Sequence, residues 1–292
     1  MIDLTGWERI AAQHIHSRGE EAPGRLSGKA VIVTGSAQGF GRGIAEELYK
    51  EGAQIVIADL NEPLAREAAE ALGERAVACR VDVSDEESVA GMVKTCVERF
   101  HGLDLFISNA GVLKAGGLEE MELKDFEFVT RVNYTAFFLC ARYASRIMKA
   151  QHEADPAWTG DIIQINSKSG LEGSNRNFAY AGGKFGGIGL VQSFAMELAP
   201  HGIKVNAVCP GNYYDGPLWS DPEKGLFVQY LRTGKVPGAQ SVEDVRRFYL
   251  SKSLIKRGCL PRDVAVAVLY AVEQAYETGQ AIPVTGGQVM LK

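Results

Sequence analysis

Residues 29–60, KAVIVTGSAQGFGRGIAEELYKEGAQIVIADL, are the stretch that decides the fold. Two runs rich in β-branched residues, 29–35 and 54–60, are too short for buried helices and have the composition of strands. The segment between them has the apolar spacing of a helix and ends at Gly52. A strand, a helix and a second strand in this order predict a βαβ unit with parallel strands.

The same alternation continues to the end of the chain. Further strands are expected at 75–83, 103–111, 160–167, 203–211 and 280–287, and further helices at 62–73, 85–102, 123–151, 179–199 and 262–277. Seven strands in one continuous alternation predict an α/β fold of the Rossmann type. We therefore expect a doubly wound, seven-stranded, mostly parallel sheet with helices on both faces.

The alternation also predicts the domain organisation. Residues 28–292 are expected to form a single domain, and residues 1–27 an N-terminal extension made of a short amphipathic helix (7–18) and a linker. Residues 211–260 break the rhythm, because they are aromatic and contain several Pro and Gly. Insertions of this kind usually lie over the carboxyl ends of the strands, where ligands bind. We expect this segment, hereafter the lid segment, to cover the substrate, the alternative being a plain loop.

Composition narrows the class of protein. A net charge of −5 argues against a nucleic-acid partner, which would require a basic surface. No apolar run approaches the roughly 20 residues that a membrane-spanning helix needs. The five cysteines are scattered, with no C-x-x-C, which favours reduced thiols in a cytoplasmic protein over disulfides or a metal site. They are expected to serve as small buried apolar side chains.

The turn after the first strand has the pattern of a dinucleotide site. Gly35, Gly39 and Gly41 lie between a strand and a helix, where glycine lets the backbone approach a pyrophosphate at the helix N-terminus. Asp59 ends the next strand, eighteen residues beyond Gly41. A carboxylate there accepts hydrogen bonds from ribose hydroxyls and repels a 2′-phosphate, so NAD is the expected cofactor. Arg42 keeps NADP open, and the alternative for the glycines is a role in packing only.

Several motifs occur in order along the chain: T-G-x-x-x-G-x-G from Thr34, Asp82-Val83, SNAG at 108–111, Asn133, Ser167, Tyr180-A-G-G-Lys184 and Pro210-Gly211. In this combination residues 28–292 resemble the short-chain dehydrogenase/reductase family. The resemblance implies that Asp82 and Val83 hold the adenine ring and that Pro210 and Gly211 flank the nicotinamide. The cofactor contacts expected in full are Gly35, Ser36, Gly39, Phe40, Gly41, Asp59, Leu60, Asp82, Val83, Asn109, Ala110, Gly111, Tyr180, Lys184, Pro210 and Gly211. Ser108 and Phe40 depart mildly from the family pattern, which often has Asn and Ile there.

The chemistry is expected at Tyr180 and Lys184, which are four residues apart and so one turn above each other on a helix. A free tyrosine has a pKa of about 10, and a neighbouring cation lowers that pKa and makes the phenol a better base. Ser167 ends the preceding strand and is placed to hydrogen-bond the substrate oxygen. The family resemblance adds that Lys184 binds the ribose and that Asn133 holds a water that relays protons. The alternative is an ordinary solvated Tyr–Lys pair.

Four glycines surround this pair: Gly182, Gly183, Gly186 and Gly187. Glycine inside a helix costs about 1 kcal/mol relative to alanine, so their presence requires a reason. We expect them to let the helix press closely against the sheet or a partner subunit.

The substrate is less well determined by the sequence. The segments IIQINSKSG, KFGGIGLVQS, LIKRGC and TGQAIPVTGGQVM resemble the branch of the family that acts on sorbitol 6-phosphate. The substrate contacts proposed from this sequence are Ser169, Arg176, Asn212 and Trp219, with Lys114 and Lys168 as further candidate cations for a phosphate. If Ser167 faces the site, Lys168 is expected to face away from it, unless it lies past the strand end, because side chains alternate along a strand; Arg176 is therefore the favoured cation. Another sugar alcohol or a 3-oxoacyl substrate is the alternative, followed by a non-catalytic NAD sensor.

The family also implies a homotetramer or dimer that associates through the helices at 123–151 and 179–199.

Overall fold

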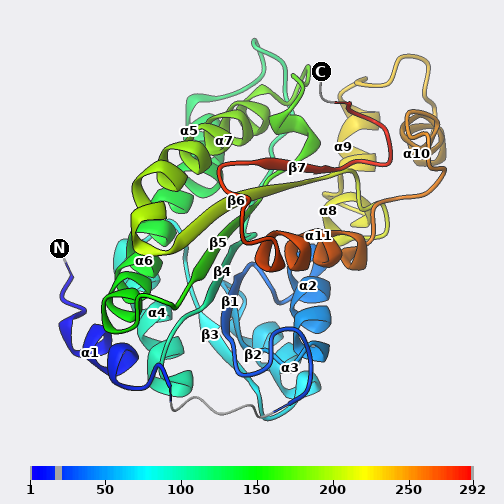
Figure 1. The fold of residues 1–292 in the computed structure, drawn as a ribbon. Helices are drawn as coiled ribbons and strands as arrows, with labels where there is room; N and C mark the ends of the chain where they lie inside the picture. Colours follow the sequence, from blue (N-terminus) through cyan, green and yellow to red (C-terminus); the bar gives the residue numbers. More distant parts are fainter. Residues whose placement is uncertain (1, 17–21, 291–292) are drawn as a thin grey trace.

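Seven parallel strands form one sheet at the centre of the molecule (Figure 1). The structure is a computed structural model and describes residues 2–16 and 22–290. The strands are β1 (Ala30–Thr34), β2 (Gln54–Asp59), β3 (Ala76–Arg80), β4 (Leu105–Ser108), β5 (Gly160–Ile165), β6 (Ile203–Pro210) and β7 (Ala281–Val284). Their order is β3-β2-β1-β4-β5-β6-β7. The chain adds β2 and β3 on one side of β1 and then β4 to β7 on the other, so the topological switch point lies between β1 and β4. The predicted doubly wound fold is confirmed, and every strand pair is parallel.

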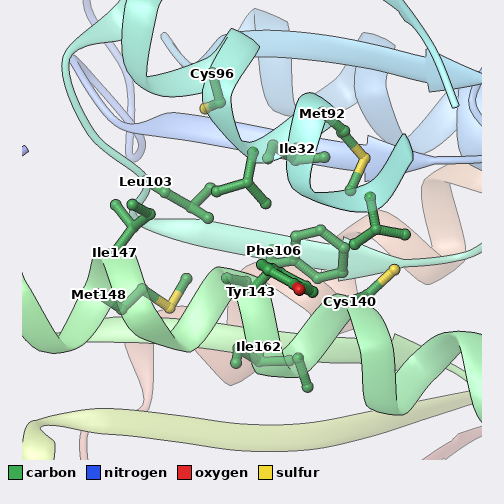
Figure 2. Close-up of a cluster of buried hydrophobic side chains, with 14 of the residues drawn as sticks. Ile32, Met92, Cys96, Leu103, Phe106, Cys140, Tyr143, Ile147, Met148 and Ile162 are labelled. Carbon is green, nitrogen blue, oxygen red and sulfur yellow. The ribbon is translucent and has the colours of Figure 1, made fainter. Parts of the chain in front are cut away.

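Helices cover both faces of this sheet. They are α2 (Gly39–Lys50), α3 (Glu62–Leu72) and α11 (Pro261–Glu273) on one face, and α4 (Glu86–Phe100), α6 (Ala136–Ala154) and α7 (Phe178–Leu198) on the other. Each face buries its own cluster of apolar side chains. Figure 2 shows part of the core beneath α4 and α6, where Phe106 of β4 lies between Met92 and Tyr143. Full burial of a side chain of this size contributes about 1.5–3 kcal/mol, so the two apolar layers hold the sheet in place.

The long helix expected at 123–151 is divided in the structure. It consists of α5 (Leu123–Thr130), a π-helical turn (Arg131–Thr135) and α6. Asn133 lies in the π-helical turn, and its side-chain amide makes two hydrogen bonds to the backbone of Val112. Such turns often occur at functional sites, because they re-aim one side chain within a helix.

The N-terminal helix packs against the main body of the protein. Helix α1 (Thr5–Gln13) contacts α4 and α6 (Figure 1). Glu8 pairs with Arg146 at 2.7 Å, and Trp7 donates a hydrogen bond to Glu98 at 2.9 Å. The helix is shorter than expected at its end, and residues 17–21, which include part of the expected linker, lie outside the described residues.

The lid segment has a small core of its own. It contains α8 (Pro217–Ser220), α9 (Leu226–Arg232) and α10 (Val242–Ser251), which Figure 1 shows together at one side of the sheet. Aromatic rings dominate the buried cluster between these helices: Tyr214, Trp219, Phe227, Tyr230 and Tyr249. The segment is thus a packed subdomain of three helices. Within residues 2–16 and 22–290, no helix is both long enough and apolar enough to cross a bilayer.

Candidate active site

The glycine turn after β1 is held by contacts that leave no room for side chains. Gly35 has φ of +63°, and a Cβ there would lie 2.8 Å from the Cα of Ala110. A Cβ at Gly41 would lie 2.2 Å from the carbonyl oxygen of Gly35. Asn109 closes the turn by donating hydrogen bonds to the carbonyls of Thr34 and Gly35, at 2.9 and 3.0 Å. Glycine is therefore required here for the backbone to turn.

The N-terminus of α2 fits an anionic group. Its first residue follows Gln38, whose side chain makes no capping hydrogen bond, and the first turn contains no acidic residue. By contrast, Asn61 caps α3 and Asp85 caps α4 with their own side chains. Because the first backbone amides of a helix have no partner within the helix, those of α2 remain available to a pyrophosphate. The residues present fit a dinucleotide at this turn.

Asp59 lies at the carboxyl end of β2, beside the same turn. Its carboxylate accepts hydrogen bonds from the backbone amides of Ala37 and Asn61, both at 3.0 Å. Arg42, the cation that could favour NADP, is paired with Glu46 at 3.0 Å. Leu60 follows and is exposed. The carboxylate is thus held in place, and the nearby arginine already has a partner.

The other predicted cofactor residues follow the carboxyl ends of the strands. The Asp82 carboxylate accepts hydrogen bonds from the amide and hydroxyl of Ser84, at 2.9 and 2.7 Å, and Val83 is buried next to it. Gly211 donates a hydrogen bond to Val284 at 2.9 Å and so joins the ends of β6, where Pro210 lies, and β7. Ser36 is buried, with its hydroxyl bonded to Val33 and Ala58. Its side chain therefore ties β1 to β2 and is not available to a ligand.

Ser167, Tyr180 and Lys184 come together from β5 and α7. Ser167 directly follows Asn166 at the end of β5, and its hydroxyl lies within hydrogen-bonding reach of the Tyr180 phenol. The Lys184 ammonium lies 5.5 Å from the centre of the Tyr180 ring and donates a hydrogen bond to the carbonyl of Ile165 at 2.9 Å. The predicted shared face of the Tyr–Lys helix is present in the structure.

The environment of the pair shifts both pKa values by burial. Burial raises the pKa of Tyr180, while the hydrogen bond from Ser167 counters that rise. Burial also lowers the pKa of Lys184 to about 8. Cys209, at the end of β6, lies close enough to interact with both groups, and burial raises the pKa of its thiol to about 11. The sequence predicts that Lys184 lowers the pKa of Tyr180, but in this structure burial raises that pKa and the group that lowers it is Ser167.

Asn166 links the strand that carries Ser167 to the helix that carries Tyr180 and Lys184, a role that the sequence did not predict. Its side-chain amide donates hydrogen bonds to Gln164 at 2.7 Å and to the carbonyl of Lys184 at 2.9 Å. Its carbonyl oxygen accepts a hydrogen bond from the Ser167 amide at 2.8 Å. Asn133 and the Lys184 ammonium both lie close to Gly111, where a Cβ would be 3.0 Å from the Asn133 side-chain oxygen and 4.0 Å from the Lys184 nitrogen. One buried amide therefore joins the end of β5 to the middle of α7.

Three of the four glycines around Tyr180 are in close contact with neighbouring elements. A Cβ at Gly187 would lie 2.6 Å from the side-chain amide of Gln164 on β5. A Cβ at Gly186 would lie 2.8 Å from the ring of Tyr134, and one at Gly183 would lie 3.5 Å from Asn133. At Gly182 a Cβ would meet no described atom within 4 Å. The expected close approach to the sheet is thus present at Gly187.

The sequence of this chain matches a known family over most of its length. A family model described as short chain dehydrogenase matches residues 29–220. The chain belongs to the short-chain dehydrogenase family. The sorbitol-6-phosphate 2-dehydrogenase of Escherichia coli (strain K12) is 36% identical over 270 residues, which cover 90% of this chain and 99% of that protein. The predicted family membership and the prediction of an enzyme are therefore confirmed.

Two further short-chain dehydrogenases match this chain over about nine-tenths of its length. The crystal structure of the sorbitol-6-phosphate 2-dehydrogenase of Erwinia amylovora is 37% identical, has a TM-score of 0.81, and is matched over 89% of this chain and 100% of that chain. The 3-alpha-(or 20-beta)-hydroxysteroid dehydrogenase of Mycobacterium bovis is 32% identical over 268 residues, 91% of each protein. Family membership therefore leaves the alcohol to be argued from the site.

The four residues predicted to contact substrate lie in environments that differ from one to the next. Ser169 is buried, and its amide donates to the Ser167 hydroxyl at 3.1 Å. Asn212 is half-buried and donates to the Tyr214 hydroxyl at 3.2 Å. Arg176 is ion-paired with Glu120. Trp219 is only 5% exposed, in the middle of the lid core, and this position does not support a direct contact with substrate.

The same region is lined by three residues for which the sequence predicted no role: Tyr213, Pro217 and Tyr230. Phe40 lies against Tyr213, with ring centres 5.1 Å apart, and Gly39 faces the Pro217 ring. These contacts bring the start of the lid segment across the glycine turn. Tyr230 of α9 lies close enough to Tyr180 to interact with it. No short motif predicts such contacts, because they join segments far apart in the chain.

Proposed function

We propose that this chain is an NAD-dependent oxidoreductase that interconverts a secondary alcohol of a polyol and the corresponding ketose, with sorbitol 6-phosphate as the substrate. The observation that carries this proposal is the meeting of Ser167, Tyr180 and Lys184 at the carboxyl end of β5. A half-buried phenol beside a buried ammonium is suited to moving the proton of an alcohol. The rest of the site is arranged around that pair.

Each side chain has a defined task in this proposal. Tyr180 takes the hydroxyl proton in the oxidation and returns it in the reduction. Ser167 donates a hydrogen bond to the substrate oxygen, and the Lys184 ammonium stabilises the phenolate and binds the ribose. Asn133 holds a water that passes protons between Lys184 and solvent. NAD, when bound, supplies the hydride acceptor.

The choice of NAD over NADP is supported by Asp59. Its carboxylate is fixed by two backbone amides at the end of β2, where the adenosine ribose is expected. A 2′-phosphate would meet this negative charge, and Arg42 is paired with Glu46. The cofactor would extend from the open amides of α2 to Pro210 and Gly211. Its expected contacts are those predicted from the sequence, with Ser36 acting through its backbone.

A phosphorylated polyol is supported by the sorbitol-6-phosphate 2-dehydrogenases to which the chain is 36% and 37% identical. The hydroxysteroid dehydrogenase is also related but less similar, at 32%. A 3-oxoacyl thioester reductase is expected to prefer NADP, which Asp59 disfavours. The lid segment, proposed to cover the substrate, would bring Tyr230 and Asn212 to it.

Self-association is also proposed, through α5, α6 and α7. Apolar side chains on these helices are exposed in the described chain: Leu123, Phe126, Phe128, Phe138, Phe185 and Met196. On α7, Phe185 and Met196 share an exposed stripe with Gly182, which would let another helix approach closely. Exposed apolar surface on this scale favours association with a second copy. We propose a homotetramer or dimer in the cytoplasm.

The test is a screen of polyols and their phosphates with the purified protein, following the absorbance of NADH. We expect turnover of sorbitol 6-phosphate with NAD, slower turnover of sorbitol, and weak activity with NADP. Asp59→Asn should reduce the preference for NAD over NADP, because it removes the repelling charge. Turnover of a steroid or a 3-oxoacyl thioester, without any polyol activity, would overturn the substrate proposal.

A further inference from the structure

Three lysines from separate segments gather beside the predicted catalytic site. Lys168 lies three residues after β5, Lys235 lies three residues after α9, and Lys252 directly follows α10. The Lys235 ammonium lies 4.2 Å from the centre of the Tyr230 ring, and the Lys252 ammonium lies 5.4 Å from that of Tyr249. The two tyrosine rings stack with their centres 5.5 Å apart, so one stacked pair of rings carries Lys235 on one ring and Lys252 on the other.

We propose that Lys168, Lys235 and Lys252 form an anion subsite that binds the phosphate of a phosphorylated polyol whose reacting hydroxyl lies at Tyr180. This inference rests on the proposed function and adds the residues that would read the phosphate. A phosphate has three strong acceptor oxygens and a charge of about −1.5 to −2 near pH 7, which suits a group of ammonium ions.

The lysine cluster is not neutralised by the protein. Among the described residues, the Lys168 and Lys252 ammonium groups have no carboxylate within the 4.0 Å of an ion pair, although Glu172 exerts a weaker attraction on Lys168. Lys235 donates a hydrogen bond to the Ser174 hydroxyl at 3.2 Å, which carries no charge. Cations that face each other without partners repel, and a bound dianion would remove that repulsion.

Titration of the cluster is consistent with this repulsion. Burial, followed by repulsion from Lys168, Lys252 and Arg176, lowers the pKa of Lys235 to about 8. Burial and repulsion from Lys252 also lower the pKa of Lys168, while Glu172 acts in the opposite direction. A bound phosphate would favour the protonated form of all three lysines and raise these pKa values.

Two of the three cations considered from the sequence alone are less suitable. Arg176 is already ion-paired with Glu120, and Lys114 lies 3.7 Å from Asp125. Lys168, the third of these cations, has no such ion pair among the described residues. The two lysines that join it come from the lid segment, more than sixty residues further along the chain.

The subsite is close to the reacting groups. Lys235 lies on the Tyr230 ring, and Tyr230 in turn lies near enough to Tyr180 for the two phenols to interact. Tyr230 therefore carries Lys235 on its ring and interacts electrostatically with the proposed general base, Tyr180. A hexitol phosphate whose second carbon lies at Tyr180 carries its phosphate at the far end of the carbon chain, on the side of the lid segment.

The test compares the variants Lys235→Gln and Lys252→Gln with the control Lys224→Gln. Lys224 is exposed, lies in the same lid segment and is outside the cluster. The readout is the ratio of kcat/KM for sorbitol 6-phosphate to that for sorbitol, with NAD. We expect each cluster variant to lower this ratio by about 10- to 100-fold, since a charge-assisted hydrogen bond contributes about 1.5–3 kcal/mol, and the control to leave it unchanged.

A second measurement tests binding without turnover. Inorganic phosphate should raise the Tm of the wild-type protein, and this rise should be smaller in Lys235→Gln, whose own Tm without phosphate should be higher because one repelling charge is gone. Phosphate bound at the N-terminus of α2 would affect all variants equally and cancels in the comparison. An unchanged substrate ratio together with an equal phosphate response would overturn the subsite. If no polyol is turned over by the wild type, the proposed function fails, while the Tm comparison still decides the subsite.

Discussion

The region around β5 and α7 and the lid segment are built in different ways. The proposed catalytic groups lie on a strand and a helix held by buried hydrogen bonds, such as those of Asn166 to Gln164 and Lys184. The lid segment is held by aromatic rings around Trp219, with its cations on the outside of that cluster. The first region is part of the parallel sheet, whereas the second is a separate small core attached at its edge.

This difference assigns the chemistry and the choice of substrate to different parts of the chain. Proton transfer needs groups fixed to within a fraction of an ångström, which the sheet and α7 provide. The choice of alcohol needs a surface that can vary without disturbing the sheet, which a separately packed segment provides. Changes in the first region should therefore affect turnover of every alcohol, and changes in the second should affect one alcohol more than another.

The largest effect is expected for Tyr180→Phe. Removal of the phenolic hydroxyl leaves no group to take the alcohol proton, so kcat/KM should fall by about 10³–10⁴-fold with every substrate. The affinity for NAD should change little, because the ring remains. Steady-state kinetics and NAD titration by fluorescence would measure both. Tyr276→Phe, at a fully exposed tyrosine, is the control, and full activity of Tyr180→Phe would refute the assignment of the base.

The next effect should separate the lid segment from the sheet. Trp219→Ala removes a ring that packs against Tyr214, Phe227, Tyr230 and Tyr249, and loss of a buried aromatic side chain costs about 3–5 kcal/mol. We expect amide exchange to accelerate within residues 214–250 but not in the strands, and KM for the polyol to rise. Leu218→Ala, at a half-exposed neighbour, should have little effect. Equal acceleration in β1 and β5 would show that the two cores unfold together.

A smaller effect is expected from the burial of Lys184, which should lower the free energy of unfolding of the wild-type protein. Burial lowers the pKa of Lys184 from 10.5 to about 8, so the folded state binds fewer protons than the unfolded state between these values. The penalty is present in full below pH 8 and disappears as the pH rises toward 10.5. Lys184→Met should therefore raise the free energy of unfolding by about 2 kcal/mol at pH 7, and by less at pH 10, while activity is lost.

Denaturant unfolding at the two pH values measures this change. Lys224→Met, at an exposed lysine, is the control and should show no such dependence on pH. A variant that is less stable than the wild type at pH 7 would mean that the hydrogen bond from Lys184 to Ile165 outweighs the cost of burial.

The sequence predicted more of the catalytic region than of the lid segment, for a physical reason. Strand and helix periods determine which residues share a face, so the pairing of Tyr180 with Lys184 followed from their spacing. Cys209, Tyr230 and Lys235 reach the site through tertiary packing, which no local pattern encodes. Trp219 was predicted to contact substrate because it lies in the lid segment, but its ring is at the centre of a buried aromatic core. The sign of the Tyr180 pKa shift depended on burial, which spacing alone does not give.

The smallest predicted effect concerns two glycines of the same helix. A Cβ at Gly187 would lie 2.6 Å from the Gln164 amide, which is buried and bonded to Asn166 and so has little freedom to move. A Cβ at Gly182 would meet no described atom within 4 Å. Gly187→Ala should therefore lower the free energy of unfolding by about 1–2 kcal/mol, from overpacking that outweighs the gain in helix propensity. Gly182→Ala should lower it by less or raise it by up to about 1 kcal/mol.

The two variants are compared by denaturant unfolding at one protein concentration, because the stability of an oligomer depends on concentration. An equal loss for the two variants would mean that the contact with β5 does not explain Gly187, whereas a loss at Gly182 that vanishes on dilution would place that glycine against a second copy of the chain.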